Sequence, residues 1–180
     1  MVAPHYTDSE ALTHDTFIAL MNALAFPGRV LTLPTASTDE SFRAIADTLL
    51  DIETSYYTPD AEWMPYLERS GSHAQTPDQA AYWFVPNRLD LDLVAQASVG
   101  TMLNPQDAST LILGCKLSAG QTTVWRGPGI QSTIAVQLAG IPEQFWKLRQ
   151  QMIHYPMGWD AFFVEGNRVI GLPRTTLVQE

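Results

Sequence analysis

The sequence predicts a layered α/β or α+β sandwich built around one mixed β-sheet. Hydrophobic periodicity indicates about three substantial helices and about seven strands, which alternate early in the chain and are mostly strands later. The chain has 180 residues, of which 46% are hydrophobic, and a chain of this length buries about two-thirds of its unfolded surface on folding. Because no repeat, low-complexity tract or linker interrupts it, we expect a single domain over residues 1–180.

Helices and short strands alternate in the first half of the chain. A helix is predicted over residues 13–25, ending before Pro27-Gly28, because four apolar residues share one face: Phe17, Leu20, Met21 and Leu24. A second helix begins at residues 38–41 and carries another apolar face: Phe42, Ile45, Leu49 and Ile52. Further expected elements are strands over residues 29–33, 54–58 and 81–85 and a helical turn over 61–67.

Strands dominate the second half, after a short helix over residues 89–96. Residues 109–117 are predicted to form a central strand, with residues 122–126 as its hairpin partner across a turn at 119–121. Residues 132–138 alternate between apolar and polar side chains, which indicates a strand with one buried face. A helix beginning at Pro142 carries Phe145, Leu148 and Met152 on one stripe. The last predicted hairpin joins strands 161–164 and 169–172 through Glu165-Gly166-Asn167.

Composition narrows the functional classes. The formal net charge of −9 argues against non-specific binding to nucleic acid or to an anionic membrane, although a small anion needs only a local cluster of donors. A single cysteine, Cys115, excludes an internal disulfide and fits a reducing compartment. The sequence shows neither a secretory leader nor an apolar run long enough to span a bilayer, so we expect a cytoplasmic protein.

Motifs for common catalytic chemistry are missing from the sequence. It contains no glycine-rich nucleotide loop and no nucleophile elbow, and its four histidines lack metal-ligand spacing, so no metal site is expected. Cys115 lies in an apolar strand and is interpreted as a structural thiol. No cofactor is expected either. Pyridoxal phosphate needs a lysine on a rigid loop, whereas Lys116 lies in a predicted strand and Lys147 on the polar side of a helix.

Two segments suggest binding. Arg126 leads into the turn Gly127-Pro128-Gly129, whose glycines allow close approach of another backbone or of an anion, unless the segment is only a turn between strands. Pro173 ends the last hairpin, so Arg174, Thr175 and Thr176 are expected at an exposed strand end.

There, one guanidinium and two hydroxyls are suited to a phosphate or phosphonate, or to an ion pair between subunits, unless they are simply solvated. Asp160 stands at the beginning of the first strand of the same hairpin. Glu53 is a weaker candidate, because a junction between helix and strand explains it equally well.

Several segments, taken in their order and spacing, resemble the PhnH family of the bacterial carbon–phosphorus lyase system. They are Phe17–Arg29, Leu49–Ser55, Gly100-Thr101 with Asn104-Pro105, Gly127–Ile130, Tyr155–Asp160 and Leu172–Thr176. Two positions depart from the family pattern: Phe26 replaces a basic residue, which weakens the case for an anion contact at that loop, and Tyr155 stands where Phe is common.

The resemblance implies a three-layer α/β sandwich with a mixed, mostly parallel sheet, similar to the main domain of pyridoxal-phosphate-dependent transferases but without the cofactor. It implies a homodimer that joins PhnG, PhnI and PhnJ and helps to form α-D-ribose 1-methylphosphonate 5-triphosphate from ATP and an alkylphosphonate. PhnI is thought to hold the nucleosidase chemistry, so this chain would be an essential, non-catalytic subunit.

Other classes remain open. The chain could be a stand-alone small phosphotransferase, a pyridoxal-phosphate enzyme or another enzyme acting on an anionic substrate, or it could be a purely structural dimer. A phosphonate or a nucleotide anion is the expected small ligand. The low charged fraction of 16% and the five tryptophans favour an apolar interface with a partner.

Overall fold

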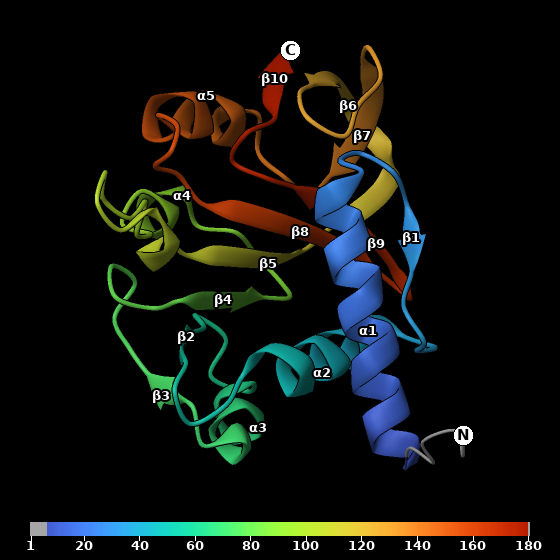
Figure 1. Ribbon diagram of the computed structural model, residues 1–180, viewed down its shortest axis with the longest axis vertical. Coiled ribbons are helices and arrows are strands. Elements are labelled where there is room, and N and C mark those ends of the chain that lie inside the picture. Colours follow the sequence, from blue (N-terminus) through green and yellow to red (C-terminus); the bar gives the residue numbers. More distant parts are fainter. Residues whose placement is uncertain (1–6, 180) are drawn as a thin grey trace, which may run out of the picture.

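A seven-stranded sheet forms the centre of the computed structural model within the described residues, 7–179 (Figure 1); residues 1–6 and 180 of the predicted domain lie outside them. Its strands, in spatial order, are β1 (Leu31–Thr32), β9 (Arg168–Leu172), β8 (Asp160–Glu165), β5 (Thr110–Gly114), β4 (Tyr82–Val85), β2 (Ser55–Tyr57) and β3 (His73–Ala74). The strands from β8 to β3 pair in parallel, whereas β9 pairs antiparallel with both β8 and β1. The sheet is therefore mixed and mostly parallel, as predicted.

Helices cover one face of this sheet. They are α1 (Asp8–Ala25), α2 (Thr38–Leu49) and α3 (Met64–Leu67), the last followed by a 3-10 turn at Glu68–Ser70. Leu20 of α1 and Phe42 and Ile45 of α2 join one apolar core with Phe84, Ile112 and Phe162 of the sheet. Figure 1 shows α1 crossing in front of β9, with which it is in contact.

A second layer of helices and strands covers the opposite face. It contains α4 (Leu91–Val94), α5 (Glu143–Met152) and an antiparallel sheet in the order β10 (Leu177–Gln179), β6 (Lys116–Arg126), β7 (Ile134–Ala139). A 3-10 turn at Pro105–Asp107 precedes β5. The core on this side is aromatic and includes Trp83, Trp125, Phe145, Trp159 and Phe163. Neighbouring residues of β8 thus face different cores, which explains its continuous apolar run.

Local patterns located most elements correctly. The hairpin of β8 and β9 turns between Glu165 and Arg168 with Gly166 at φ +57°. Strand β7 buries Val136 and Leu138, as its alternation predicts. Helix α1 begins earlier than predicted, because Thr7 and Glu10 form a reciprocal capping box at its start.

The predicted hairpin between residues 109–117 and 122–126 is wrong. Strand β5 pairs with β4 and β8, so both of its hydrogen-bonding edges are occupied within the central sheet. Strand β6 crosses instead to the smaller sheet and pairs with β7 and β10. The expected turn at 119–121 lies inside β6, where the register with β7 shifts between Leu117 and Gln121.

The predicted buried face of α1 is correct for Leu20 and Leu24, which join the core, and wrong for Phe17 and Met21. Phe17 and Met21 are 50% and 48% exposed, whereas Ala19, Leu20 and Ala23 are buried. A Cβ added at Gly171 of β9 would lie 2.4 Å from the Ala23 carbonyl oxygen, so the helix touches the sheet through its small residues. Phe17, Ile18 and Met21 are consequently turned outward.

Two further expectations fail on burial. Ile52, assigned to the apolar face of α2, lies in the turn after that helix and is 71% exposed. All five tryptophans are buried in the two cores, with at most 7% exposure, so they do not indicate an interface. Among residues 7–179, no helix is both long and apolar enough to cross a membrane.

Candidate functional site

The ion pair of Asp160 and Arg174 is the centre of the polar cluster at the beginning of β8. Because β8 and β9 are antiparallel, residue 160 and the segment after Leu172 meet at one edge of the sheet. Asp160 Oδ1 accepts a hydrogen bond from the Arg174 backbone N–H at 2.6 Å, and Oδ2 accepts one from Nη2 at 2.8 Å. The two side chains are only 18% and 17% exposed. The expectation of a solvent-exposed Arg174 is therefore wrong, since the ion pair draws the guanidinium inward.

Arg174 also holds the loop that precedes β5. Its Nη1 donates to the Pro105 carbonyl oxygen at 2.6 Å. The Gly158 N–H donates to the Val99 carbonyl oxygen at 2.8 Å, so the loop before β5 and the loop before β8 lie side by side. Segments of the family resemblance that are far apart in the sequence are thereby brought together.

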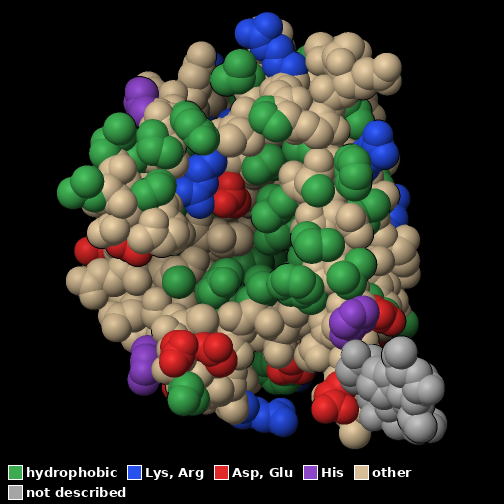
Figure 2. All heavy atoms as spheres, in the orientation of Figure 1, with side chains coloured by type: hydrophobic (Ala, Val, Ile, Leu, Met, Phe, Trp, Pro, Cys, Tyr) green, Lys and Arg blue, Asp and Glu red, His purple; other side chains and the backbone are tan. Residues whose placement is uncertain are grey.

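Exposed apolar side chains cover these two loops. Met102, Leu103 and Tyr155 are 65%, 91% and 76% exposed, and we call them the apolar loop surface. Figure 2 shows hydrophobic side chains gathered in this region, at the upper left of the view. Exposed apolar groups held together on ordered loops are typical of a surface that binds another protein.

The turn at Gly127-Pro128-Gly129 packs against two other segments. Gly127 has φ +152°, and a Cβ there would lie 3.0 Å from the Thr175 carbonyl oxygen. Gly129 has φ +82°, and a Cβ there would lie 2.1 Å from the Ala25 carbonyl oxygen. The glycines thus permit close approach of backbone, which is one of the two roles that the sequence suggested. Arg126 and Pro128 are exposed on either side of Gly127.

Arg149 of α5 packs against the segment from Pro173 to Thr176. It was not identified as a site residue from the sequence. It is 4% exposed, and its Nη1 and Nη2 donate to the carbonyl oxygens of Thr176 and Pro173, each at 2.9 Å. Burial lowers its pKa to about 10, against the opposing effect of the nearby Asp160 charge. The sequence could have indicated its burial, because residue 149 lies one helical turn after Phe145 and therefore on the same, buried face of the helix.

The threonines after Arg174 differ in exposure. Thr175 is half-buried, whereas Thr176 is 1% exposed and its Oγ1 has no hydrogen-bond partner within the described residues. Neither lies at an open strand end, because the chain continues into β10.

Glu53 does not join this cluster. Its side chain is exposed in the turn between α2 and β2, where its N–H donates to Asp51 Oδ1 at 2.9 Å. Strands β5 and β4 separate β2 from β8, so the strand that follows Glu53 lies about 14 Å from β8 across the sheet. Glu53 is therefore explained by its place in the junction between helix α2 and strand β2.

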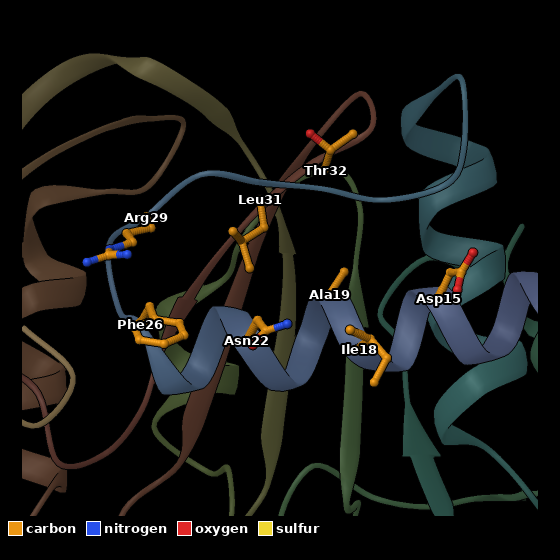
Figure 3. A pocket seen from close by; sticks show the side chains of 8 residues that line it. All are labelled: Asp15, Ile18, Ala19, Asn22, Phe26, Arg29, Leu31 and Thr32. Carbon is orange, nitrogen blue, oxygen red and sulfur yellow. The ribbon is translucent and has the colours of Figure 1, made fainter.

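A groove of about 520 Å³ lies between α1 and the segment that leads into β1 (Figure 3). Ile18, Phe26 and Leu31 line it, and Leu31 points toward the helix. Asp15 lies at one end and Arg29 at the other, with the Arg29 guanidinium 4.9 Å from the centre of the Phe26 ring. The groove is thus apolar with opposite charges at its ends.

Groups suited to catalysis are sparse in the part of the chain that the structure describes. No group of three or more His, Cys, Asp or Glu side chains there is placed to hold a metal ion. Burial, together with the charge of Glu165, raises the pKa of the Cys115 thiol to about 12. Cys115 is therefore protonated at neutral pH, which fits a structural thiol.

Comparisons with known proteins support the family resemblance that the sequence segments suggested. The model of the family described as bacterial phosphonate metabolism protein (PhnH) matches residues 4–179. A protein named as a candidate C–P lyase subunit, HtxG from Stutzerimonas stutzeri, is 31% identical over 164 residues, covering 89% of this chain and 82% of its own. The PhnH subunit of α-D-ribose 1-methylphosphonate 5-triphosphate synthase from Rhizobium meliloti is 27% identical over 190 residues, covering 97% and 94%.

The family match spans nearly all of the described chain, including the ion pair, the glycine turn and the apolar loop surface. This chain belongs to the PhnH family of bacterial phosphonate metabolism proteins.

Proposed function

We propose that this chain is an essential, non-catalytic subunit of the carbon–phosphorus lyase complex. In this proposal it takes part in forming α-D-ribose 1-methylphosphonate 5-triphosphate from ATP and an alkylphosphonate in the cytoplasm. The names of both relatives describe subunits, and the alignments cover most of each relative. The single half-buried Cys115 is compatible with the cytoplasm.

The bonding within the polar cluster supports a structural role. The Asp160 carboxylate is engaged by the backbone and the guanidinium of Arg174, and Arg174 in turn holds Pro105. A general acid or base needs an accessible carboxylate within hydrogen-bond reach of substrate. Here the carboxylate instead links the end of β9, the beginning of β8 and the loop before β5.

The observation that carries the proposal is the apolar loop surface. Leu103 is 91% exposed at the tip of a loop that is anchored by the partly buried ion pair. Burial of water-exposed leucine and methionine side chains by a partner makes the free energy of association more favourable. We propose that PhnG, PhnI or PhnJ covers this surface in the complex.

The test is replacement of Leu103 by Asp in a strain that depends on this chain for growth on methylphosphonate as sole phosphorus source. We expect Leu103→Asp to leave the melting temperature unchanged, because the side chain is solvated. We also expect it to abolish co-purification with tagged PhnI and PhnJ and to stop growth, since a carboxylate in a dry interface is strongly unfavourable.

Ile52→Asp is the matched control, because Ile52 is also an exposed apolar residue, at 71%, but lies in the turn after α2. This variant should keep both the partners and growth. Normal growth and normal co-purification with Leu103→Asp would place the docking surface elsewhere. Growth supported by this chain in the absence of the other subunits would favour a stand-alone enzyme.

We also propose that the chain forms a homodimer through the groove beside α1. Phe17, Ile18 and Met21 on α1 are 50%, 37% and 48% exposed, next to the groove. A two-fold axis brings the same patch of both copies together in opposite directions. The negative end of the groove in one copy therefore faces the positive end in the other. Asp15 of one copy then meets Arg29 of the other. Sedimentation velocity at micromolar concentration tests this, and a monomer that persists at high concentration contradicts it.

We also propose that the fold is similar to the main domain of pyridoxal-phosphate-dependent transferases and that the chain does not bind the cofactor. Its support is the mixed, mostly parallel sheet covered on both faces. Lys116 is exposed on β6, and Lys147 is exposed on α5 with its Nζ 3.6 Å from Glu143. Neither lysine is set in a closed pocket of the kind that holds a Schiff base.

A further inference from the structure

Arg149 is a buried cation without a carboxylate partner. Its side chain is 4% exposed, yet within residues 7–179 it forms no salt bridge, and its two hydrogen bonds go to backbone carbonyl oxygens. The Nε–H is buried and has no acceptor. A guanidinium has five N–H donors, so three remain unused. Buried charges in proteins are normally paired, because an unpaired one loses its hydration without compensation.

A small cavity lies against this guanidinium. Its volume is about 100 Å³, and its lining includes the polar residues Arg149, Arg174 and Thr176 and the apolar residues Trp146, Ile153 and Val178. The Thr176 hydroxyl is buried and also lacks a partner. Each water molecule in the liquid takes up about 30 Å³, so the cavity has room for a few waters or for one small polyatomic ion.

The charges around the cavity do not balance. Arg174 is neutralised by Asp160, which it contacts at 2.8 Å. Among the described residues, Arg149 has no carboxylate within ion-pair distance, and its charge is offset in part by the Trp159 ring, whose centre lies 5.9 Å from Arg149 Cζ, and by the more distant Asp160. Although burial lowers the pKa of Arg149 to about 10, the group stays protonated at neutral pH. Within the part of the chain that the structure describes, the lining thus includes Arg149, whose charge has no carboxylate within ion-pair distance, and Thr176, whose buried hydroxyl has no hydrogen-bond partner.

We propose that this cavity binds a tetrahedral phosphorus oxyanion, either inorganic phosphate or a small phosphonate. Planar guanidinium groups match the oxygens of such an anion, and its charge neutralises Arg149. The Thr176 hydroxyl donates a further hydrogen bond. All the residues that line the cavity come from this chain.

The experiment measures binding of inorganic phosphate, methylphosphonate and, as a comparison anion, nitrate to the purified full chain at constant ionic strength. Isothermal titration calorimetry gives the affinity, and thermal unfolding gives the stabilisation that binding to the folded state produces. We expect phosphate, methylphosphonate or both to raise the melting temperature, whereas nitrate should not. The relative affinities of the two phosphorus anions identify the natural source. If neither binds, the cavity holds only water and the proposal is wrong.

Two variants locate the site. Thr176→Val is nearly isosteric and removes an unpartnered hydroxyl, so the anion-free protein should be at least as stable as wild type. Its affinity for the phosphorus anion should fall about tenfold, the effect of one hydrogen bond to a charged group. Unchanged affinity in Thr176→Val overturns the assignment of the anion to this cavity.

Arg149→Met removes the charge and should abolish binding. Arg88→Met is its control, because Arg88 is exposed in the loop after β4 and its loss changes the net charge equally. Arg88→Met should bind normally, and equal losses in both variants would show a non-specific charge effect and refute the site. If Arg149→Met does not fold, Thr176→Val decides the question.

Discussion

A single carboxylate, that of Asp160, joins three segments of the chain. It binds the backbone and guanidinium of Arg174 after β9, and through Arg174 it holds the Pro105 carbonyl of the loop before β5. Both side chains of the pair are more than four-fifths buried. Limited contact with water leaves their attraction less screened than that of a surface ion pair.

Asp160→Ala should therefore destabilise the protein by about 2–4 kcal/mol, because it leaves a largely buried guanidinium without its carboxylate. Arg174→Ala should cost a similar amount, contrary to the expectation for an exposed strand end. Urea unfolding of both single variants and of the double variant measures the losses and their coupling.

The control for this prediction is the exposed pair of Glu143 and Lys147, whose charged atoms are 3.6 Å apart. Glu143→Ala should change the stability by about 0.5 kcal/mol or less. Equal unfolding midpoints for Glu143→Ala and Asp160→Ala would show that Asp160 contributes no more than a surface charge.

At the scale of elements, glycines and alanines set the position of α1. Gly171 of β9 allows contact with the Ala23 carbonyl, and Gly129 of the turn after β6 allows contact with the Ala25 carbonyl. The last turn of α1 is thus held between the central sheet and the Gly127-Pro128-Gly129 turn. This packing presents Phe17 and Met21 to the outside.

Gly129→Ala should be strongly destabilising, by about 3 kcal/mol or more. The new Cβ would lie 2.1 Å from the Ala25 carbonyl oxygen, and φ is +82°, so a steric clash adds to backbone strain. Gly166→Ala is the matched control. It has φ +57° but nothing within 4 Å of an added Cβ, and should cost only about 1 kcal/mol. Comparison of the two melting temperatures checks the prediction, which fails if the losses are equal.

Two apolar surfaces lie at separate places on the whole molecule. The apolar loop surface lies at the ends where β5 and β8 begin, and the groove beside α1 lies next to β1. Their separation allows the molecule to pair with a second copy and to bind another subunit at the same time. The overall charge of −9 opposes self-association at low salt, so the proposed dimer requires local attraction at the groove.

Charge exchange tests the two-fold pairing. Asp15→Arg and Arg29→Asp should each weaken the dimer about tenfold, because each places like charges together across the axis. The double variant restores opposite charges and should recover most of the affinity. Sedimentation velocity over a range of concentrations measures this, and Leu103→Asp should dimerise like wild type. Failure of the double variant to recover would exclude this arrangement of the two copies.

The sequence by itself determined the elements whose formation depends on neighbours along the chain. The β8–β9 hairpin follows from Gly166-Asn167 between apolar runs, and β7 follows from its alternation of side chains. The family is also readable from the sequence, because its short segments keep their order and spacing. The sequence likewise indicated the Asp160 and Arg174 hairpin end and, separately, the glycine turn as candidate segments, although the ligand and docking roles assigned to them remain predictions.

Only the tertiary structure decided which strands pair and which side chains are buried. Strand β6 leaves β5 because β4 and β8 already occupy both edges of β5. Arg174 is inward because Asp160 and Pro105, which is 69 positions away, provide its acceptors. Arg149 is buried because β10 and the segment before it fold over α5. Periodicity and turn chemistry act over a few residues, whereas pairing and burial depend on groups that only folding brings into contact.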